Sequence, residues 1–444
     1  MNRALISNIF SSFADKAFTT IAMLAATLIL VRVLPRSDYG IIGIVVGYAI
    51  FVQLLSLPLE NAILRDHKKY YASIEKYLLN YLAFNLLKGV VFIIIGAVLA
   101  IVLPVIYGDN GFFWAVLSMV VVIIGDSIIS PFIIYASTQY KQSLVTVINM
   151  VRYSLNVLLL LGLLVLPEHV PMLSYVLVKD IVIYSIIIVI WIVAIKKYLA
   201  INFSKLSIVK EFDPKFIWNT LSNYSLWVHL TGVVTNFIYR ADTLFLSFFS
   251  SLDSVGNYNI ALNTANFANI APSILGYHNS VAISHSETSN DSLNLTNKFL
   301  RASIYLGILM IVGYLALGTM LLKTITGDDD VENIYLYMIC IVSGLIAVKT
   351  FASPFVAYIN IKGDVKKLFY RVNLPTLLFT AIVYLLAVQL YGAIGLAMSN
   401  IVVAIFWISL LMLEMKKYGY HIPQRNEYLQ DFRALNKYLF KINL

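Results

Sequence analysis

The sequence predicts an all-α integral membrane protein, with twelve transmembrane helices in two lobes of six. Hydrophobic residues make up 60% of the chain and charged residues 12%, which is too apolar for the surface of a soluble protein. The apolar stretches reach the roughly 20 residues that cross a bilayer, where uninterrupted runs of this length are helices. The second half of the chain also repeats motifs of the first half, which predicts two similar lobes.

The twelve spans are expected, in chain order, at 13–34, 40–59, 78–104, 112–137, 145–166, 171–195, 219–249, 255–283, 299–324, 334–360, 368–390 and 393–415. Lysine and arginine residues collect at both ends of the chain and in every second connection. By the positive-inside rule, the two termini are therefore expected on the cytoplasmic side, in agreement with an even number of spans.

The repeat is seen in three pairs of segments whose offsets range from 216 to 223 residues. They are SPFIIY at Ser130–Tyr135 with SPFVAY at Ser353–Tyr358, IKKY at Ile195–Tyr198 with MKKY at Met415–Tyr418, and Gly40 with Gly256. Because the first half contains six spans, an even number, both halves begin on the same side of the membrane. The repeats are therefore expected to be parallel, related by an axis along the membrane normal.

Four regions follow from this organisation. Residues 1–199 are the expected N-terminal lobe, the polar stretch 200–215 the linker, 216–418 the C-terminal lobe and 419–444 a cytoplasmic tail. The tail has two interpretations of equal weight, an amphipathic helix on the membrane surface or a solvated segment.

Ionisable residues inside the predicted spans are candidates for function, because lipid solvates them poorly. The cations are Lys88, Arg152, Lys179, Arg240 and Lys349, and the carboxylates are Asp126, Asp180 and Asp242. The positive surplus would attract an anionic ligand into a water-filled interior. Asp126 and Lys349 occupy equivalent repeat positions. An ion pair between them across the pseudo-axis is one interpretation, and pairing of each within its own lobe is the favoured one.

Polar side chains follow one face of the seventh and eighth spans at helical spacing. They are Ser222, Ser225, His229, Gly232, Asn236, Arg240 and Thr243 on one, and Asn259, Asn263, Asn266, Ser273, Tyr277, Ser280 and Ser284 on the other. For any single residue, hydrogen bonding between packed helices is the favoured interpretation. Two full stripes favour an aqueous cavity lined by these helices.

The sequence lacks the residue patterns of several kinds of enzymatic and metal site. The single Cys340 and six histidines show no metal-ligand spacing, and no GxSxG or nucleotide-binding loop is present. Membrane topology explains the net charge of +9 better than nucleic-acid binding does. We therefore expect no enzymatic activity, cofactor, metal or nucleic-acid partner.

Three segments resemble a known family: LVRVLPRSDYGIIG from Leu30, RADTLFLSFFSSLDSVGNYNIA from Arg240 and YGAIGLAMSN from Tyr391. They are similar to the polysaccharide exporters of the multidrug/oligosaccharidyl-lipid/polysaccharide (MOP) superfamily, with the Wzx-type O-antigen flippases the best match. The resemblance covers essentially the whole chain. It implies a MATE-like fold in the bacterial inner membrane that moves an undecaprenyl diphosphate-linked oligosaccharide to the periplasmic leaflet by alternating access.

The resemblance also implies a cationic cavity lined by the first two helices of each lobe. Its first candidates are Arg240, Asn263 and Asn266, with Arg32 nearer the outer mouth. The remaining candidates are the other polar and cationic residues of the spans: Lys88, Arg152, Lys179, Lys349, Asn236 and Asn259. Expected partners are the lipid-linked glycan, membrane lipid, a polysaccharide polymerase and a chain-length regulator.

Two questions remain open at this point. Energy for transport could come from an ion or proton gradient through Asp126, Asp180 or Asp242, or from removal of the product. The alternative functions are a multidrug or organic-cation antiporter of the same superfamily and a membrane-embedded glycan polymerase. The polymerase is disfavoured because the external connections are too short to carry catalytic residues.

Overall fold

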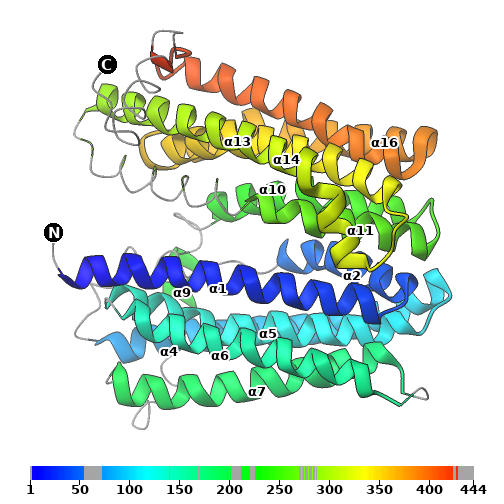
Figure 1. Ribbon diagram of the computed structural model, residues 1–444. Helices are drawn as coiled ribbons and strands as arrows, with labels where there is room; N and C mark the ends of the chain where they lie inside the picture. Colours follow the sequence, from blue (N-terminus) through cyan, green and yellow to red (C-terminus); the bar gives the residue numbers. More distant parts are fainter. Residues whose placement is uncertain are drawn as a thin grey trace, which may run out of the picture. The chain divides into compact units, whose positions relative to one another are not determined.

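The structure is a computed structural model, shown in Figure 1. It describes residues 3–54, 73–139, 141–167, 170–199, 201, 212–220, 226–269, 272, 275, 279, 283, 286, 288–423, 427 and 428. Among these residues every regular element is a helix, and eight helices are long and apolar enough to cross a membrane. The all-helical membrane class is therefore confirmed, while the count of twelve spans stays a prediction.

The chain forms two compact units. Unit 1 contains residues 1–260 and 323–329, and unit 2 contains residues 261–322 and 330–444. The linker expected at 200–215 lies mostly outside the described residues, as does the tail after residue 428. The lobe boundaries expected from the sequence therefore stay predictions.

Unit 1 holds the first helices of the chain. They are α1 (Arg3–Val33), α2 (Arg36–Leu54), α4 (Ile74–Tyr107), α5 (Gly111–Thr138), α6 (Gln142–Leu160) with the 3-10 turn η2 (Leu161–Val165), α7 (Met172–Tyr198), α9 (Pro214–Thr220), α10 (Leu226–Ser247) and most of α11 (Leu252–Asn266). Helix α5 packs between α4 and α7, and α1 runs beside α6 (Figure 1).

The core of unit 1 fills the space around one end of α5. Tyr81, Phe132 and Trp191 are buried there, one from each of α4, α5 and α7. Phe216 of α9 packs edge to face against Tyr77 of α4, with ring centroids 5.6 Å apart. Burial of large aromatic side chains gives the largest hydrophobic stabilisation per residue, so this cluster fixes the register of the three long helices.

Unit 2 is built on a long pair of helices. It contains the end of α11, the 3-10 turn η4 (Phe267–Asn269), most of α13 (Ser289–Thr326), α14 (Glu332–Lys362), α15 (Val365–Leu368), the π-helical turn η5 (Phe369–Asn373) and α16 (Leu374–Lys416). Helix α14 packs along α16. Pro354 lies inside α14 as its repeat partner Pro131 lies inside α5.

Gly392 interrupts α16 with φ 60° and ψ −142°, a backbone conformation that suits glycine. The helical stretch from Val365 to Lys416 has 52 residues. At 1.5 Å per residue it reaches roughly 78 Å, more than twice the thickness of a bilayer core. The kink stands between the spans expected at 368–390 and 393–415, so the stretch is long enough for two passes.

Candidate functional site

The first polar cluster joins α5, α6 and α7 inside unit 1. The Arg152 guanidinium lies 2.9 Å from the Asp126 carboxylate. The Tyr184 hydroxyl donates to Asp126 at 3.0 Å and accepts from Arg152, whose guanidinium also lies 4.8 Å from the Tyr184 ring centroid. The interpretation that Asp126 pairs within its own lobe is therefore confirmed. The ion pair is not fully buried, because 49% of the Asp126 side chain is exposed.

A second polar cluster lies on the same three helices. Lys179 forms an ion pair with its neighbour Asp180, and both side chains are buried. The Lys179 ammonium also donates to Asn156 Oδ1 of α6 at 2.8 Å, and the Ser118 hydroxyl of α5 donates to Asp180. Buried ions need such partners, because leaving either charge unpaired in an apolar interior is costly.

The third cluster connects α10 and α11. Asp242 is fully buried, and it accepts hydrogen bonds from the Tyr258 hydroxyl at 2.7 Å and the Thr243 backbone N–H at 2.8 Å. The Thr243 hydroxyl donates to Asn259 Oδ1 at 3.2 Å, and Asn259 is also buried. This corner of the two stripes is therefore packed rather than open, as the interhelical interpretation expects.

Helices α2 and α11 cross at a reciprocal glycine contact. A Cβ on Gly40 would lie 2.3 Å from the Leu252 carbonyl oxygen, and a Cβ on Gly256 would lie 2.2 Å from the Arg36 carbonyl oxygen. A repeat offset of 216 residues relates Arg36 to Leu252 and Gly40 to Gly256, so the two halves of the contact are equivalent. Only glycine permits this approach of two helix backbones.

The ends of α1 and α2 contact residues 323–329, which also belong to unit 1. Arg32 donates to the Thr324 carbonyl oxygen at 2.5 Å, and Arg36 pairs with Asp328 at 2.6 Å. A hydrogen bond from Lys323 lowers the pKa of Asp329 in the same segment. Arg32 thus lies at the end of α1, and its expected position near an outer mouth stays a prediction.

The other candidates lie on α4, α10, α11 and α14. Lys88 of α4 is buried, with its ammonium 5.2 Å from the Phe84 ring centroid. On α10, Arg240 is half-buried and Asn236 exposed, whereas His229 of the same stripe is buried. Asn263 and Asn266 of α11 and Lys349 of α14 are half-buried in unit 2, and the last four residues of the second stripe lie outside the described residues.

Within unit 1 the structure therefore gathers candidates into separate groups. Four of them share α5–α7, and Asp242 and Asn259 share the α10–α11 contact. Sequence reasoning missed Tyr184, Tyr258, Asn156 and Ser118, which provide the partners. Tyr184 and Asn156 had a usable signal, because they lie four residues after Asp180 and Arg152 on the same helix face. Within the described residues, no group of three or more His, Cys, Asp or Glu side chains is placed to hold a metal ion.

No family model and no curated protein matches this sequence. Solved structures do match in fold. Lipid II flippase MurJ, in an inward closed conformation, gives a TM-score of 0.65 at 15% identity, covering 98% of this chain and 94% of its own. This chain therefore shares the fold of that flippase. The expectation of that fold is confirmed, and the Wzx type stays a proposal.

Two further structures belong to MATE transporters. An inward-facing multidrug resistance MATE family transporter of the MOP superfamily gives a TM-score of 0.59 at 14% identity, covering 93% of this chain and 95% of its own. The eukaryotic MATE transporter AtDTX14 gives 0.59 at 12% identity, with 96% and 99% covered. These neighbours are transporters and a flippase rather than enzymes. At such identities the likeness establishes the fold and leaves the cargo open.

Proposed function

We propose that this protein moves a lipid-linked oligosaccharide with an anionic diphosphate, of the undecaprenyl type, from the cytoplasmic to the periplasmic leaflet. The observation that carries the proposal is the state of the three carboxylates that are candidates for function inside the spans. Asp126 pairs with Arg152 and Asp180 with Lys179, while Asp242 is fully buried under Tyr258. An organic cation would have to displace an arginine, a lysine or a buried hydrogen bond to reach them.

The cations outnumber the carboxylates in the spans, and this favours an anionic cargo. Among the candidate residues inside the spans, five are cations and three are carboxylates. Arginine offers a planar fork for phosphate oxygens and lysine a point charge, while asparagine side chains suit sugar hydroxyls. Contacts with the cargo are proposed for Lys88, Arg240 and Lys349, for Arg152 and Lys179 on opening of their ion pairs, and for Asn259 on opening of its contact with Thr243. They are also proposed for Arg32, Asn236, Asn263 and Asn266.

The finer expectations belong to the same proposal. We propose a Wzx-type flippase for O-antigen or a related polysaccharide unit, in the bacterial inner membrane, with twelve spans in two lobes and both termini in the cytoplasm. A polymerase and a chain-length regulator would use its product. Coupling to an ion or proton gradient is assigned to Asp126, Asp180 or Asp242.

A second candidate is an organic-cation antiporter, favoured by the two MATE neighbours and by the half-exposed Asp126 side chain. In that case Asp126 would release Arg152 and bind the cation instead. The two functions differ in the sign of the cargo charge, so a single set of variants separates them.

The test is a translocation measurement on purified full-length protein in proteoliposomes, using a fluorescent undecaprenyl diphosphate-linked oligosaccharide. Arg240→Gln is expected to slow translocation about tenfold or more, because a charge-assisted hydrogen bond to phosphate is lost. Arg240→Lys keeps the charge and is expected to retain part of the rate. The matched control is Lys323→Gln, which removes an exposed cation paired with Asp329.

A parallel measurement follows uptake of a cationic dye. The flippase proposal expects no transport of the dye and no effect of Asp126→Asn on it. It is overturned if Arg240→Gln translocates the glycan lipid at the wild-type rate, or if dye uptake is robust and depends on Asp126. Elution of each variant as a single species ensures that a lost rate is not a folding defect.

A further inference from the structure

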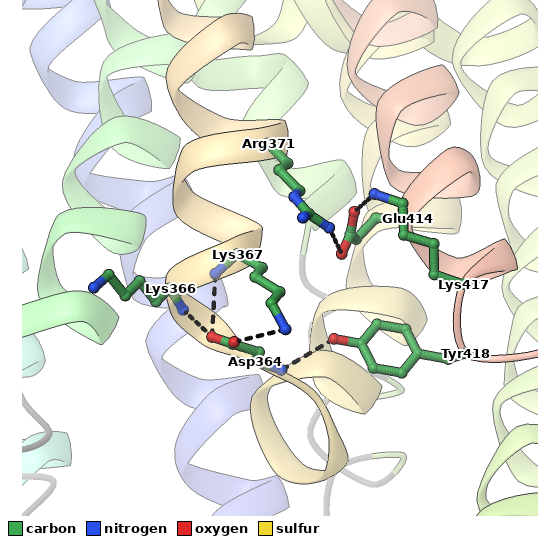
Figure 2. A network of polar contacts seen from close by, with 7 residues as sticks. All are labelled: Asp364, Lys366, Lys367, Arg371, Glu414, Lys417 and Tyr418. Carbon is green, nitrogen blue, oxygen red and sulfur yellow. Dashed lines mark hydrogen bonds and ion pairs between the residues drawn. The ribbon is translucent and has the colours of Figure 1, made fainter.

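A group of cations lies where α14 ends and α16 ends, in unit 2, with the Lys366 side chain pointing away from the other three (Figure 2). We define the α14–α16 cationic cluster as Lys366, Lys367, Arg371 and Lys417. Lys366, Lys367 and Arg371 follow the turn after α14, and Lys417 follows the last residue of α16. The cluster therefore brings together positions that are nearly 50 residues apart in sequence. It belongs to the end of the spans that the positive-inside rule places in the cytoplasm.

One buried carboxylate organises two of these cations. The Glu414 side chain is only 3% exposed, and its two oxygens lie 2.5 Å from the Lys417 ammonium and 3.5 Å from the Arg371 guanidinium. A single negative charge thus holds two positive charges beside each other. The remaining surface of both cations faces outward, since 53% of the Lys417 side chain and 49% of the Arg371 side chain are exposed.

The turn that carries the lysines is fixed by Asp364. Its carboxylate accepts hydrogen bonds from the backbone N–H groups of Lys366 and Lys367, at 3.0 and 3.2 Å. The Lys367 ammonium returns to the same carboxylate at 3.3 Å, and the Asp364 N–H donates to the Tyr418 hydroxyl at 3.1 Å. The lysines are therefore held in a capped turn bonded to the end of α16.

Charge and position together indicate the ligand. With the neighbouring Lys362 and Lys416, six cations stand against two carboxylates, and both carboxylates are already engaged within the cluster. Exposed apolar and aromatic side chains, Ile361 and Tyr370, adjoin the cations. Aromatic residues beside basic ones are typical of the headgroup level of a bilayer, where anionic lipids attract lysine and arginine.

We propose that the α14–α16 cationic cluster binds the phosphate headgroup of an anionic phospholipid in the leaflet at that end. Arg371 offers two parallel N–H donors to the phosphate, and Lys367 and Lys417 offer single charged donors beside it. Glu414 and Asp364 act as positioning residues, because they hold the cations while a net positive charge remains. This inference does not depend on the identity of the transported cargo.

The test uses full-length protein in nanodiscs of phosphatidylcholine into which palmitoyl-oleoyl phosphatidylglycerol is titrated, with the retained lipids counted by native mass spectrometry. Wild-type protein is expected to retain phosphatidylglycerol in preference to phosphatidylcholine. The double variant Lys367→Gln/Lys417→Gln is expected to lower that preference roughly 25-fold, at about fivefold for each charge removed near the membrane surface. Arg371→Lys is expected to weaken it less, because the charge remains and the fork is lost.

The matched control is Lys196→Gln/Lys197→Gln, at the exposed end of α7. It removes the same number of charges from the helix end that corresponds to the end of α16, with Lys197 equivalent to Lys417, and is expected to change phosphatidylglycerol retention little. The proposal is overturned if both double variants lose the lipid equally, which would indicate a general surface charge effect. It also fails if wild-type protein shows no preference, or if inorganic phosphate displaces the lipid at equal concentration. Melting temperatures of the variants keep loss of fold separate from loss of binding.

Discussion

The ends of α7 and α16 carry almost the same four residues in different surroundings. At Met415–Tyr418 the preceding residue is Glu414, buried and bonded to Lys417 and Arg371. At Ile195–Tyr198 the equivalent residue is Ala194, which is buried in the apolar cluster around Trp191. There the Lys197 ammonium lies 5.3 Å from the Tyr198 ring centroid, and no carboxylate among the described residues forms an ion pair with it.

The same contrast appears in the turn that packs against each end. Asp364 and Lys141 are related by the 223-residue offset. The Asp364 N–H donates to the Tyr418 hydroxyl, whereas the Lys141 ammonium donates to the Tyr198 carbonyl oxygen. Duplication has thus kept the helix end and its tyrosine anchor while the charges around them diverged. The difference teaches that a repeated sequence predicts a repeated backbone. A few substitutions then decide the electrostatic role of each copy.

The largest effect is expected from Ala194→Glu, which gives the α7 end the carboxylate of α16. Ala194 is 3% exposed among apolar side chains, and Lys197 is its only basic neighbour one turn away on α7. A carboxylate there would lower the free energy of unfolding by about 3 kcal/mol or more, because its charge would be buried with few polar partners. Thermal unfolding in detergent measures this, with Ala194→Val as the apolar control. Equal stability of Ala194→Glu and wild type would show that the two ends are interchangeable.

A smaller loss is expected from Glu414→Gln, which makes α16 resemble α7 in charge while keeping the side-chain shape. Two charge-assisted contacts become neutral ones, which costs about 1–2 kcal/mol after allowance for the half-exposed cations. The same unfolding measurement applies, and Glu332→Gln at the exposed start of α14 is the control. An unchanged melting temperature for Glu414→Gln would mean that Glu414 does not organise the cations.

The smallest effect concerns Asp364, whose pKa is lowered from its usual value of 3.8, chiefly by the Lys367 backbone N–H. Its capping contribution is therefore fully present above pH 3.8 and is lost as the pH falls through the lowered value. Asp364→Ala should reduce the melting temperature by about 1–2 °C at neutral pH, with the difference from wild type closing in acid. Asp364→Asn, which still caps, should match wild type at neutral pH and lose the dependence on pH. A constant difference between Asp364→Ala and wild type down to acidic pH would contradict this role.

Sequence was a good guide to the helices and a weaker guide to their contacts. The span expected at 112–137 is α5, Gly111–Thr138, because a continuous apolar run between polar ends sets its own limits. The kink at Gly392 also fits two adjacent spans. Apolar periodicity identifies a helix face, however, and not the helix that faces it. The pairing of Asp126 with Arg152 was therefore open until α5 and α6 were placed.

The candidate site was predicted only in its residue types. The sequence suggests separate roles for Lys179 and Asp180, although the flexible lysine side chain folds back onto its neighbour's carboxylate. Tyr258 lies off the stripe that contains Asn259 and carries no signal in the sequence, yet its hydroxyl reaches the buried Asp242. Such tyrosine contacts depend on the distance between two helices, which no pattern within one helix encodes.

The reciprocal crossing of α2 and α11 has an evolutionary consequence. In an isologous interface, two copies of one surface meet so that each residue contact occurs twice. Gly40 against Leu252 and Gly256 against Arg36 follow that rule inside a single chain. The crossing is the kind that two identical half-length polypeptides would form as a homodimer, and fusion of their genes would have preserved it as an internal contact.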